Sequence, residues 1–294
     1  MSGAAALAGA VTGIQVGAAM VATRFVLDQT GPASLALLRY AIGALVLLPV
    51  LLATARVRIA GRDLLPIALL GVGQFGVLIA LLNLGLQTVP AGRAALLFST
   101  MPLLTLVLAV AAGRESPSVP KVTGVLLTLL GVALALGEGA FTGGPGWAGE
   151  AAILASASCG AACTILYRPY LGRYPALPVG VLAMLASIAF LAMPAAAEGF
   201  FAAVPGFTAA GWLAVAFIGI SSGACFWLWL WALGRATPTR VAVFLTLSPV
   251  AASVLGGALL GEAVSPALAA GVACVALGIW FAHRPLPEGR PVRG

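Results

Sequence analysis

The chain repeats itself at a constant spacing of 147 residues, half of its length of 294. Residue types that are rare in this chain match at that spacing without a gap. The matching pairs are Arg93 with Arg240, Pro102 with Pro249, Glu115 with Glu262, Ser118 with Ser265, Gly124 with Gly271, Gly131 with Gly278 and Gly76 with Gly223. A biased composition can align Ala with Ala by chance, but not Arg, Pro and Glu at one offset. The chain is therefore a fused duplication, and its repeat unit determines the architecture.

Composition identifies what the unit is made of. The chain is 62% hydrophobic and 8% charged, whereas soluble domains carry about 25% charged residues. Apolar runs of about 20 residues recur from end to end, the length that a membrane-spanning helix needs. Helices are the open-chain structure that satisfies backbone hydrogen bonds in lipid, and the runs do not alternate as barrel strands do. These observations exclude a soluble globule and predict an all-α membrane protein.

Ten spans can be drawn, five in each repeat. They are Ala4–Val26, Ser34–Thr54, Leu64–Leu84, Gly92–Ala112, Val119–Leu136, Gly149–Tyr167, Val179–Ala196, Ala209–Leu233, Thr239–Leu260 and Pro266–Phe281. We expect one five-helix repeat in residues 1–138, a Gly-rich linker in 139–148, a second repeat in 149–284 and a cytoplasmic tail in 285–294. Ser265 followed by Pro266 is typical of a capped helix start, with Pro at the first helical position.

Basic residues set the orientation. With the N-terminus inside, twelve lie in cytoplasmic connections and in the tail, and only Arg24 and Arg93 lie outside. The cytoplasmic set is Arg56, Arg58, Arg62, Arg114, Lys121, Arg168, Arg173, Arg235, Arg240, Arg284, Arg290 and Arg293. This bias predicts two cytoplasmic termini, and it accounts for the net charge of +7 without a nucleic-acid partner. Because five helices per repeat is an odd number, the second repeat must be inverted, which is typical of transporters.

Several of these residues also carry a family resemblance. Pro102 lies in mid-span with Arg114-Glu115 at the exit, and Pro249 with Gly261-Glu262 occupies the same places in the second half. Together with Leu38-Arg39-Tyr40, this ordered set resembles the drug/metabolite transporter superfamily, and specifically its EamA-type ten-helix exporters. Within these the chain is most similar to the YddG-type amino-acid exporters. Val16 and Gly160 stand where the family often has Trp, so the cargo preference of relatives is not carried over.

Cargo sites in such folds lie near the membrane midplane, between the two halves. The polar side chains predicted at that depth are Gln74, Gln15, Ser99, Thr100, Ser158, Ser221, Ser222, Thr246 and Ser248. Gln74 and Ser221 are repeat mates, as are Ser99 and Thr246, and a neutral amide that donates and accepts suits a zwitterion. The alternative role is structural: Ser and Thr hydroxyls often bond to carbonyls of their own helix.

Two alternative roles are also open for Trp227 and for Arg39. Trp227, near Trp229 and Trp231, either belongs to the aromatic belt at the membrane surface or forms the floor of a cavity. Arg39, a charge inside a span, either attracts a carboxylate or extends toward Asp28 in the neighbouring loop, and the structural role is favoured. Cys159 and Cys163 share a helix face with no His or carboxylate nearby, so we expect no metal site and no cofactor.

Function follows by comparing classes. A membrane enzyme needs a cluster of catalytic side chains, and none is predicted, so we expect no catalytic residues. The prediction is a monomeric exporter of small amino acids or similar metabolites in a bacterial inner membrane, working by alternating access through a central cavity. Multidrug efflux and nucleotide-sugar transport are alternatives in the same superfamily. Anionic cargo, however, would require more basic residues deep in the spans than Arg39.

Overall fold

A computed structural model describes residues 3–54, 58–113, 118–136, 147–202, 206–237, 241–263 and 265–282. In these ranges the regular structure is helical throughout, with no strand. Seven helical stretches among them are long and apolar enough to cross a membrane, and α7, α12 and α13 are three further apolar helices. The ten predicted spans are therefore present. The predicted linker, apart from residues 147 and 148, and the predicted tail lie outside the described residues.

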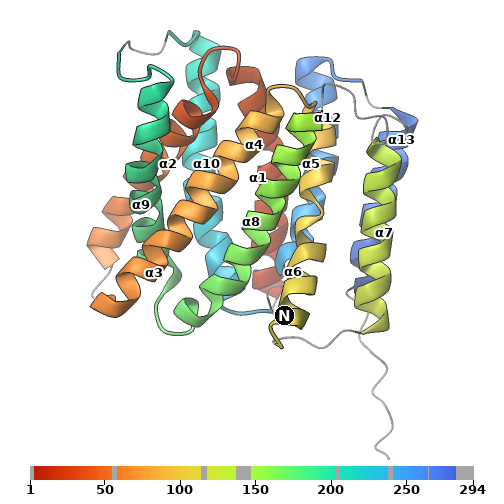
Figure 1. Ribbon diagram of the computed structural model, residues 1–294, viewed down its shortest axis with the longest axis horizontal. Helices are drawn as coiled ribbons and strands as arrows, with labels where there is room; N and C mark the ends of the chain where they lie inside the picture. Colours follow the sequence, from red (N-terminus) through yellow and green to blue (C-terminus); the bar gives the residue numbers. More distant parts are fainter. Residues whose placement is uncertain are drawn as a thin grey trace, which may run out of the picture.

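The first half follows the predicted spans, with two of them divided. Its elements are α1 (Gly3–Val26), α2 (Pro32–Thr54), α3 (Gly61–Gly71), the π-helical turn η1 (Val72–Val77), α4 (Leu78–Leu86), α5 (Ala91–Phe98), α6 (Met101–Ala111) and α7 (Val119–Leu136). Helices α3, η1 and α4 form one continuous span, and α5 and α6 form another. Figure 1 shows them standing side by side, with α7 at one edge.

The second half repeats this order. Its elements are α8 (Trp147–Leu171), α9 (Ala176–Ala197), α10 (Ala209–Leu233), the 3-10 turn η3 (Val243–Leu247), α12 (Ser248–Leu260) and α13 (Pro266–Ala282). Ser265 starts α13 as predicted, because its hydroxyl accepts a hydrogen bond from the Leu268 amide at 3.1 Å.

Helix packing reproduces the duplication. Helix α1 packs against α10 and α12, while α8, its counterpart 147 residues later, packs against α4 and α6. Two further contacts join counterparts directly, α2 with α9 and α7 with α13; the second pair forms the right-hand edge of Figure 1. This exchange of partners is what two inverted copies of one unit produce, and it confirms the predicted architecture.

Proline interrupts the fourth span of each half at the same place. Helix α5 ends at Phe98 and α6 begins at Met101, immediately before Pro102. In the second half η3 ends at Leu247, and Pro249 stands in the first turn of α12. A Pro has no amide hydrogen and its ring collides with the preceding turn, so a helix bends or breaks there. The sequence predicted Pro in mid-span but not the break.

Small residues let α1 approach the second half closely. A Cβ atom at Gly9 would lie within 3 Å of the Phe244 ring, and one at Gly13 would overlap the Phe244 carbonyl oxygen. One at Gly17 would overlap the carbonyl oxygen of Ser248. The face of α1 that carries Gly9, Gly13 and Gly17 therefore packs inside the chain. This close approach brings the α1 side chains Thr12, Gln15 and Val16 to the boundary between the halves.

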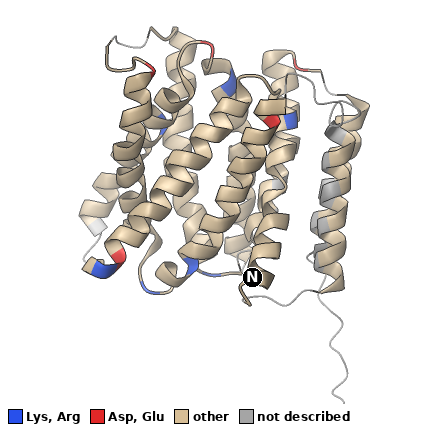
Figure 2. Ribbon diagram, in the orientation of Figure 1, with Lys and Arg blue, Asp and Glu red and all other residues tan. Residues whose placement is uncertain are grey.

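Apart from Arg39, the charged residues coloured on the ribbon in Figure 2 lie near the two ends of the helices. Among the described residues, three ion pairs join one half to the other: Arg24 with Glu262 at 2.7 Å, Arg93 with Glu150 at 3.1 Å, and Arg173 with Asp63 at 2.8 Å. Glu198 also links the halves, since its carboxylate accepts hydrogen bonds from the Ala33 and Ser34 amides at the start of α2.

Candidate functional site

A cavity lies between the two halves. Its wall is built by α1, α2, η1, α4, α5 and α6 of the first half, and by α10 and η3 of the second. The cavity volume is about 80 Å³, smaller than the roughly 300–1,000 Å³ of typical small-molecule sites. The lining is Thr12, Gln15, Val16, Met20, Thr23, Arg39, Tyr40, Gln74, Phe75, Leu78, Ile79, Leu82, Leu86, Phe98, Met101, Ser222, Phe226, Trp229 and Leu245.

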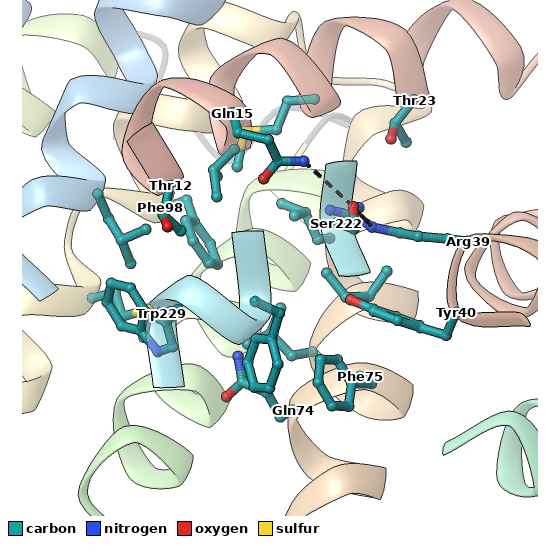
Figure 3. A pocket seen from close by; sticks show the side chains of 18 of the residues that line it. Thr12, Gln15, Thr23, Arg39, Tyr40, Gln74, Phe75, Phe98, Ser222 and Trp229 are labelled. Carbon is teal, nitrogen blue, oxygen red and sulfur yellow. Dashed lines mark hydrogen bonds between the residues drawn. The ribbon is translucent and has the colours of Figure 1, made fainter. Parts of the chain in front are cut away.

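Three elements meet at a polar corner of this cavity (Figure 3). The Arg39 Nε of α2 donates a hydrogen bond to the Ser222 hydroxyl of α10 at 2.8 Å. From α1, the Gln15 amide donates to Ser221 at 2.9 Å and to Ser222 at 3.4 Å. The structure thus brings Gln15, Ser221 and Ser222 together; Gln15 and Ser222 line the cavity, and Ser221 does not. The two serines anchor the amide and the guanidinium at the edge of the cavity.

Arg39 differs from its expected role. It is only 7% exposed, it lines the cavity, and its guanidinium lies 5.7 Å from the centre of the Tyr40 ring. Asp28, the expected partner, lies on the exposed loop after α1 and lines a separate outer pocket. The difference arises from tertiary packing. Helix α10 brings Ser222 to Arg39, whereas the sequence near Arg39 offered only Asp28 in the neighbouring loop as a partner.

Gln74 lies in the π-helical turn of the third span. π turns widen a helix by one residue and often mark functional sites. The turn packs against α8, where the Cys159 thiol donates to the Gly73 carbonyl at 3.3 Å. The Gln74 side chain lines the cavity, and its buried Oε1 has no hydrogen-bond partner. Because buried polar atoms are normally paired, this oxygen is an acceptor available to a ligand.

Aromatic rings form much of the remaining wall. Tyr40 and Phe75 have ring centroids 4.6 Å apart, and Phe75 and Phe226 lie 4.2 Å apart in an edge-on arrangement. Phe98 and Trp229 line another part of the cavity (Figure 3). The site therefore combines a polar corner with an extensive apolar surface, the composition of a pocket for a small amphipathic molecule.

Several predicted site residues lie elsewhere. The hydroxyls of Ser99 and Thr100 donate to the carbonyls of Ala95 and Leu97 of their own helix, and neither residue lines the cavity. Ser248 is fully buried outside the lining, and its hydroxyl has no partner. The Thr246 side chain lies outside the described part of the chain. Ser99 and Thr100, which stand between α5 and α6, therefore have the structural role that was the alternative to cargo binding: their hydroxyls bond to backbone carbonyls.

Ser158 and Trp227 also lie outside the cavity, and for Trp227 this agrees with the alternative of the aromatic belt. Ser158 is exposed on the outside of α8, where its hydroxyl donates to the Leu154 carbonyl. Trp227 is 38% exposed on the outer side of α10, whereas Trp229 is 4% exposed and lines the cavity. Successive helical residues turn by about 100°, so positions two apart point to nearly opposite sides. Trp227 is thus replaced by Trp229 in the wall.

The inverted repeats and the cavity between them define a membrane carrier. A family model described as the EamA-like transporter family matches the chain twice, over residues 3–137 and 147–283. The chain belongs to the EamA-like transporter family. It is a transporter and not an enzyme.

Two curated relatives extend over most of the chain. A "Probable terminal-alkyne amino-acid exporter" of Streptantibioticus cattleyicolor is 30% identical over 90% of this chain and 89% of its own length. An "Uncharacterized transporter" of Archaeoglobus fulgidus is 29% identical over 91% of this chain and 94% of its own. A solved crystal structure is similar over 95% of both chains, with a TM-score of 0.73 and 23% identity, which supports the fold.

Proposed function

We propose that this transporter exports small neutral amino acids by alternating access through the central cavity. The observation that carries the proposal is the composition of the wall: a cation, an amide and a hydroxyl meet at one corner, a second amide lies on another wall, and aromatic rings form much of the rest. Donors and acceptors together suit a carboxylate and an ammonium on one molecule. The relative named as an amino-acid exporter supports this cargo.

We further propose that transport runs down the cargo's own gradient. The lining contains no Asp or Glu among the described residues, so a proton relay through a cavity carboxylate has no group to use there. Four described carboxylates, those of Asp63, Glu150, Glu198 and Glu262, are instead engaged in ion pairs and a helix cap near the helix ends.

Exchange in proteoliposomes tests cargo and coupling together. Vesicles loaded with unlabelled methionine should take up labelled methionine with no pH or sodium gradient, because neither ion has a binding carboxylate in the cavity. Protein-free vesicles measure leakage. Exchange that requires an imposed gradient refutes the uncoupled mechanism, and transport confined to nucleotide sugars or cationic drugs refutes the cargo.

We also propose a topology. Residues 1–138 and 149–284 form the two repeats, residues 139–148 connect them outside, and both termini and the tail 285–294 are cytoplasmic in a bacterial inner membrane. The basic residues support this orientation through the positive-inside bias. We propose a monomer, since the Gly9, Gly13 and Gly17 face packs against the chain's own second half.

Cysteine labelling tests the topology. A Gly144→Cys variant in the linker should react with an impermeant thiol reagent on intact cells, because the linker follows an odd number of spans. Gly61→Cys is the matched control at the cytoplasmic end of α3, where the added side chain meets open space, and it should react only after lysis. The reverse pattern contradicts the proposed orientation. The native cysteines do not interfere, since Cys159, Cys163, Cys225 and Cys274 all lie within helices.

A further inference from the structure

We infer that Arg39 binds the carboxylate of the cargo, so that the cavity selects carboxylate-bearing molecules with an apolar side chain. The inference rests on the proposed function and specifies which part of the cargo each wall recognises. Arg39 is buried and charged, and an isolated buried charge is costly unless it is paired.

The chain offers no carboxylate to Arg39 within its described residues. Asp63 pairs with Arg173, Glu150 with Arg93, and Glu262 with Arg24. Glu198 is bound at the start of α2, and Asp28 is exposed in its loop. The negative charge that balances this guanidinium must therefore come from outside the described protein. A ligand in the cavity can reach Arg39, because Arg39 lines it.

The geometry of Arg39 favours a carboxylate in particular. Its Nε is occupied by the Ser222 hydroxyl, and no partner of its two terminal nitrogens is seen among the described residues. A guanidinium has five donors in a rigid fork, and two parallel N–H groups fit the two oxygens of a carboxylate. Gln15 also donates to the Ser222 hydroxyl and to its neighbour Ser221, and so holds this corner in place from α1.

The other walls define the rest of the cargo. The unpaired Oε1 of Gln74 is an acceptor for an ammonium group. Tyr40, Phe75 and Phe226 offer adjoining rings for an apolar side chain. A third charge, on an acidic or basic side chain of the cargo, would have no oppositely charged partner left in the described lining, because Arg39 is its only charged residue and already binds the carboxylate. Zwitterions with aromatic or aliphatic side chains are therefore favoured over basic and acidic ones.

Paired competitors test the inference on the unaltered protein. In proteoliposomes that exchange labelled phenylalanine, unlabelled phenylalanine should compete at least about tenfold better than phenylalaninamide, which keeps the ring and the amine but lacks the carboxylate. A loss of one charge-assisted contact corresponds to about this factor. Equal competition by acid and amide overturns the inference, including the case in which a bound inorganic anion neutralises Arg39.

Variants assign the effect to Arg39. Arg39→Gln should lower phenylalanine exchange about tenfold or more and remove the preference for acid over amide, because a neutral amide keeps hydrogen bonding but not charge. Arg39→Lys should restore part of the preference, since it supplies a charge without the fork. Arg62→Gln is the matched control, because it removes an exposed Arg at the cytoplasmic end of α3, and it should behave as wild type.

The outcomes separate the two proposals. If wild-type protein exchanges amino acids and amides equally, and Arg39→Gln does the same, the carboxylate site is wrong while amino-acid transport stands. If wild-type protein exchanges no member of an amino-acid panel, both proposals are wrong. If Arg39→Gln is not recovered folded, the acid-to-amide preference of wild type still decides the inference.

Discussion

Replacing Gly13 by Leu should reduce the recovered folded protein at least about tenfold. Helix α1 meets η3 there with its backbone almost in contact, and a Cβ at Gly13 would overlap the Phe244 carbonyl oxygen. Overpacking a core with flexible neighbours costs about 1–3 kcal/mol. Here the neighbour is backbone, flanked by a second close approach of Gly17 to Ser248, so the helix as a whole must move. The resulting separation would also disrupt the α1 wall of the cavity.

Fluorescence-detected size-exclusion of a reporter fusion measures this effect. Gly3→Leu is the matched control, because it makes the same change in the same helix where a Cβ meets nothing within 4 Å. We expect a monodisperse peak for Gly3→Leu and its loss for Gly13→Leu. Equal peaks would show that α1 and η3 are not in close contact.

Gln74→Leu should lower transport by about tenfold or more while leaving the folded yield unchanged. The Oε1 of Gln74 has no partner in the described protein, so an apolar residue of similar size leaves no protein group unpaired. Such a change is neutral or stabilising for folding. The cargo, in contrast, loses an acceptor for its ammonium group, and a hydrogen bond to a charged group contributes roughly 1.5–3 kcal/mol.

Exchange of labelled methionine and phenylalanine, normalised to folded protein, measures the loss. Ser99→Ala is the control, because the Ser99 hydroxyl only bonds to its own helix at Ala95, and we expect near-normal transport. Gln15→Leu and Thr246→Val should cost less than Gln74→Leu. Wild-type exchange by Gln74→Leu across a panel of cargos would assign Gln74 to packing.

Much of the fold could be predicted because its signals are long and redundant. Each apolar run exceeds what a soluble helix needs, and one offset relates Arg, Pro and Glu in both halves. The π turn around Gln74 could not be predicted, because its residues, Val72–Val77, differ little in composition from the helix on either side. Nor could the breaks before Pro102 and Pro249 be distinguished from kinks, since Pro permits both.

The candidate site was predicted less completely, because it depends on helix rotation. Helix α10 is almost wholly apolar, and its only strong polar signal is Ser221-Ser222. Ser222 stands seven positions before Trp229, on the same helix face, and this spacing could have selected Trp229 over Trp227 for the cavity wall. Helix α8 carries Ser156 and Ser158 on different faces: Ser156 is buried and donates to the Leu78 carbonyl, and Ser158 is exposed. Arg39 and Ser222 are 183 positions apart, a contact that no local pattern contains.

The three ion pairs between the halves have a consequence for the energy of the transport cycle. Two exact copies would make the outward-open and inward-open states equal in energy by symmetry, but the ion pairs are not duplicated. Arg24–Glu262 and Arg93–Glu150 lie toward the outer ends of the helices in the proposed topology, and Arg173–Asp63 lies toward the inner ends. In each pair the Arg side chain is 28–44% exposed and the carboxylate is 8–15% exposed, so solvent screens the attraction mainly from the Arg side. Opening either face breaks at least one of these pairs, so the preference between the two states depends on ionic strength. A carrier with strong pairs at one face would rest in a single state and turn over slowly.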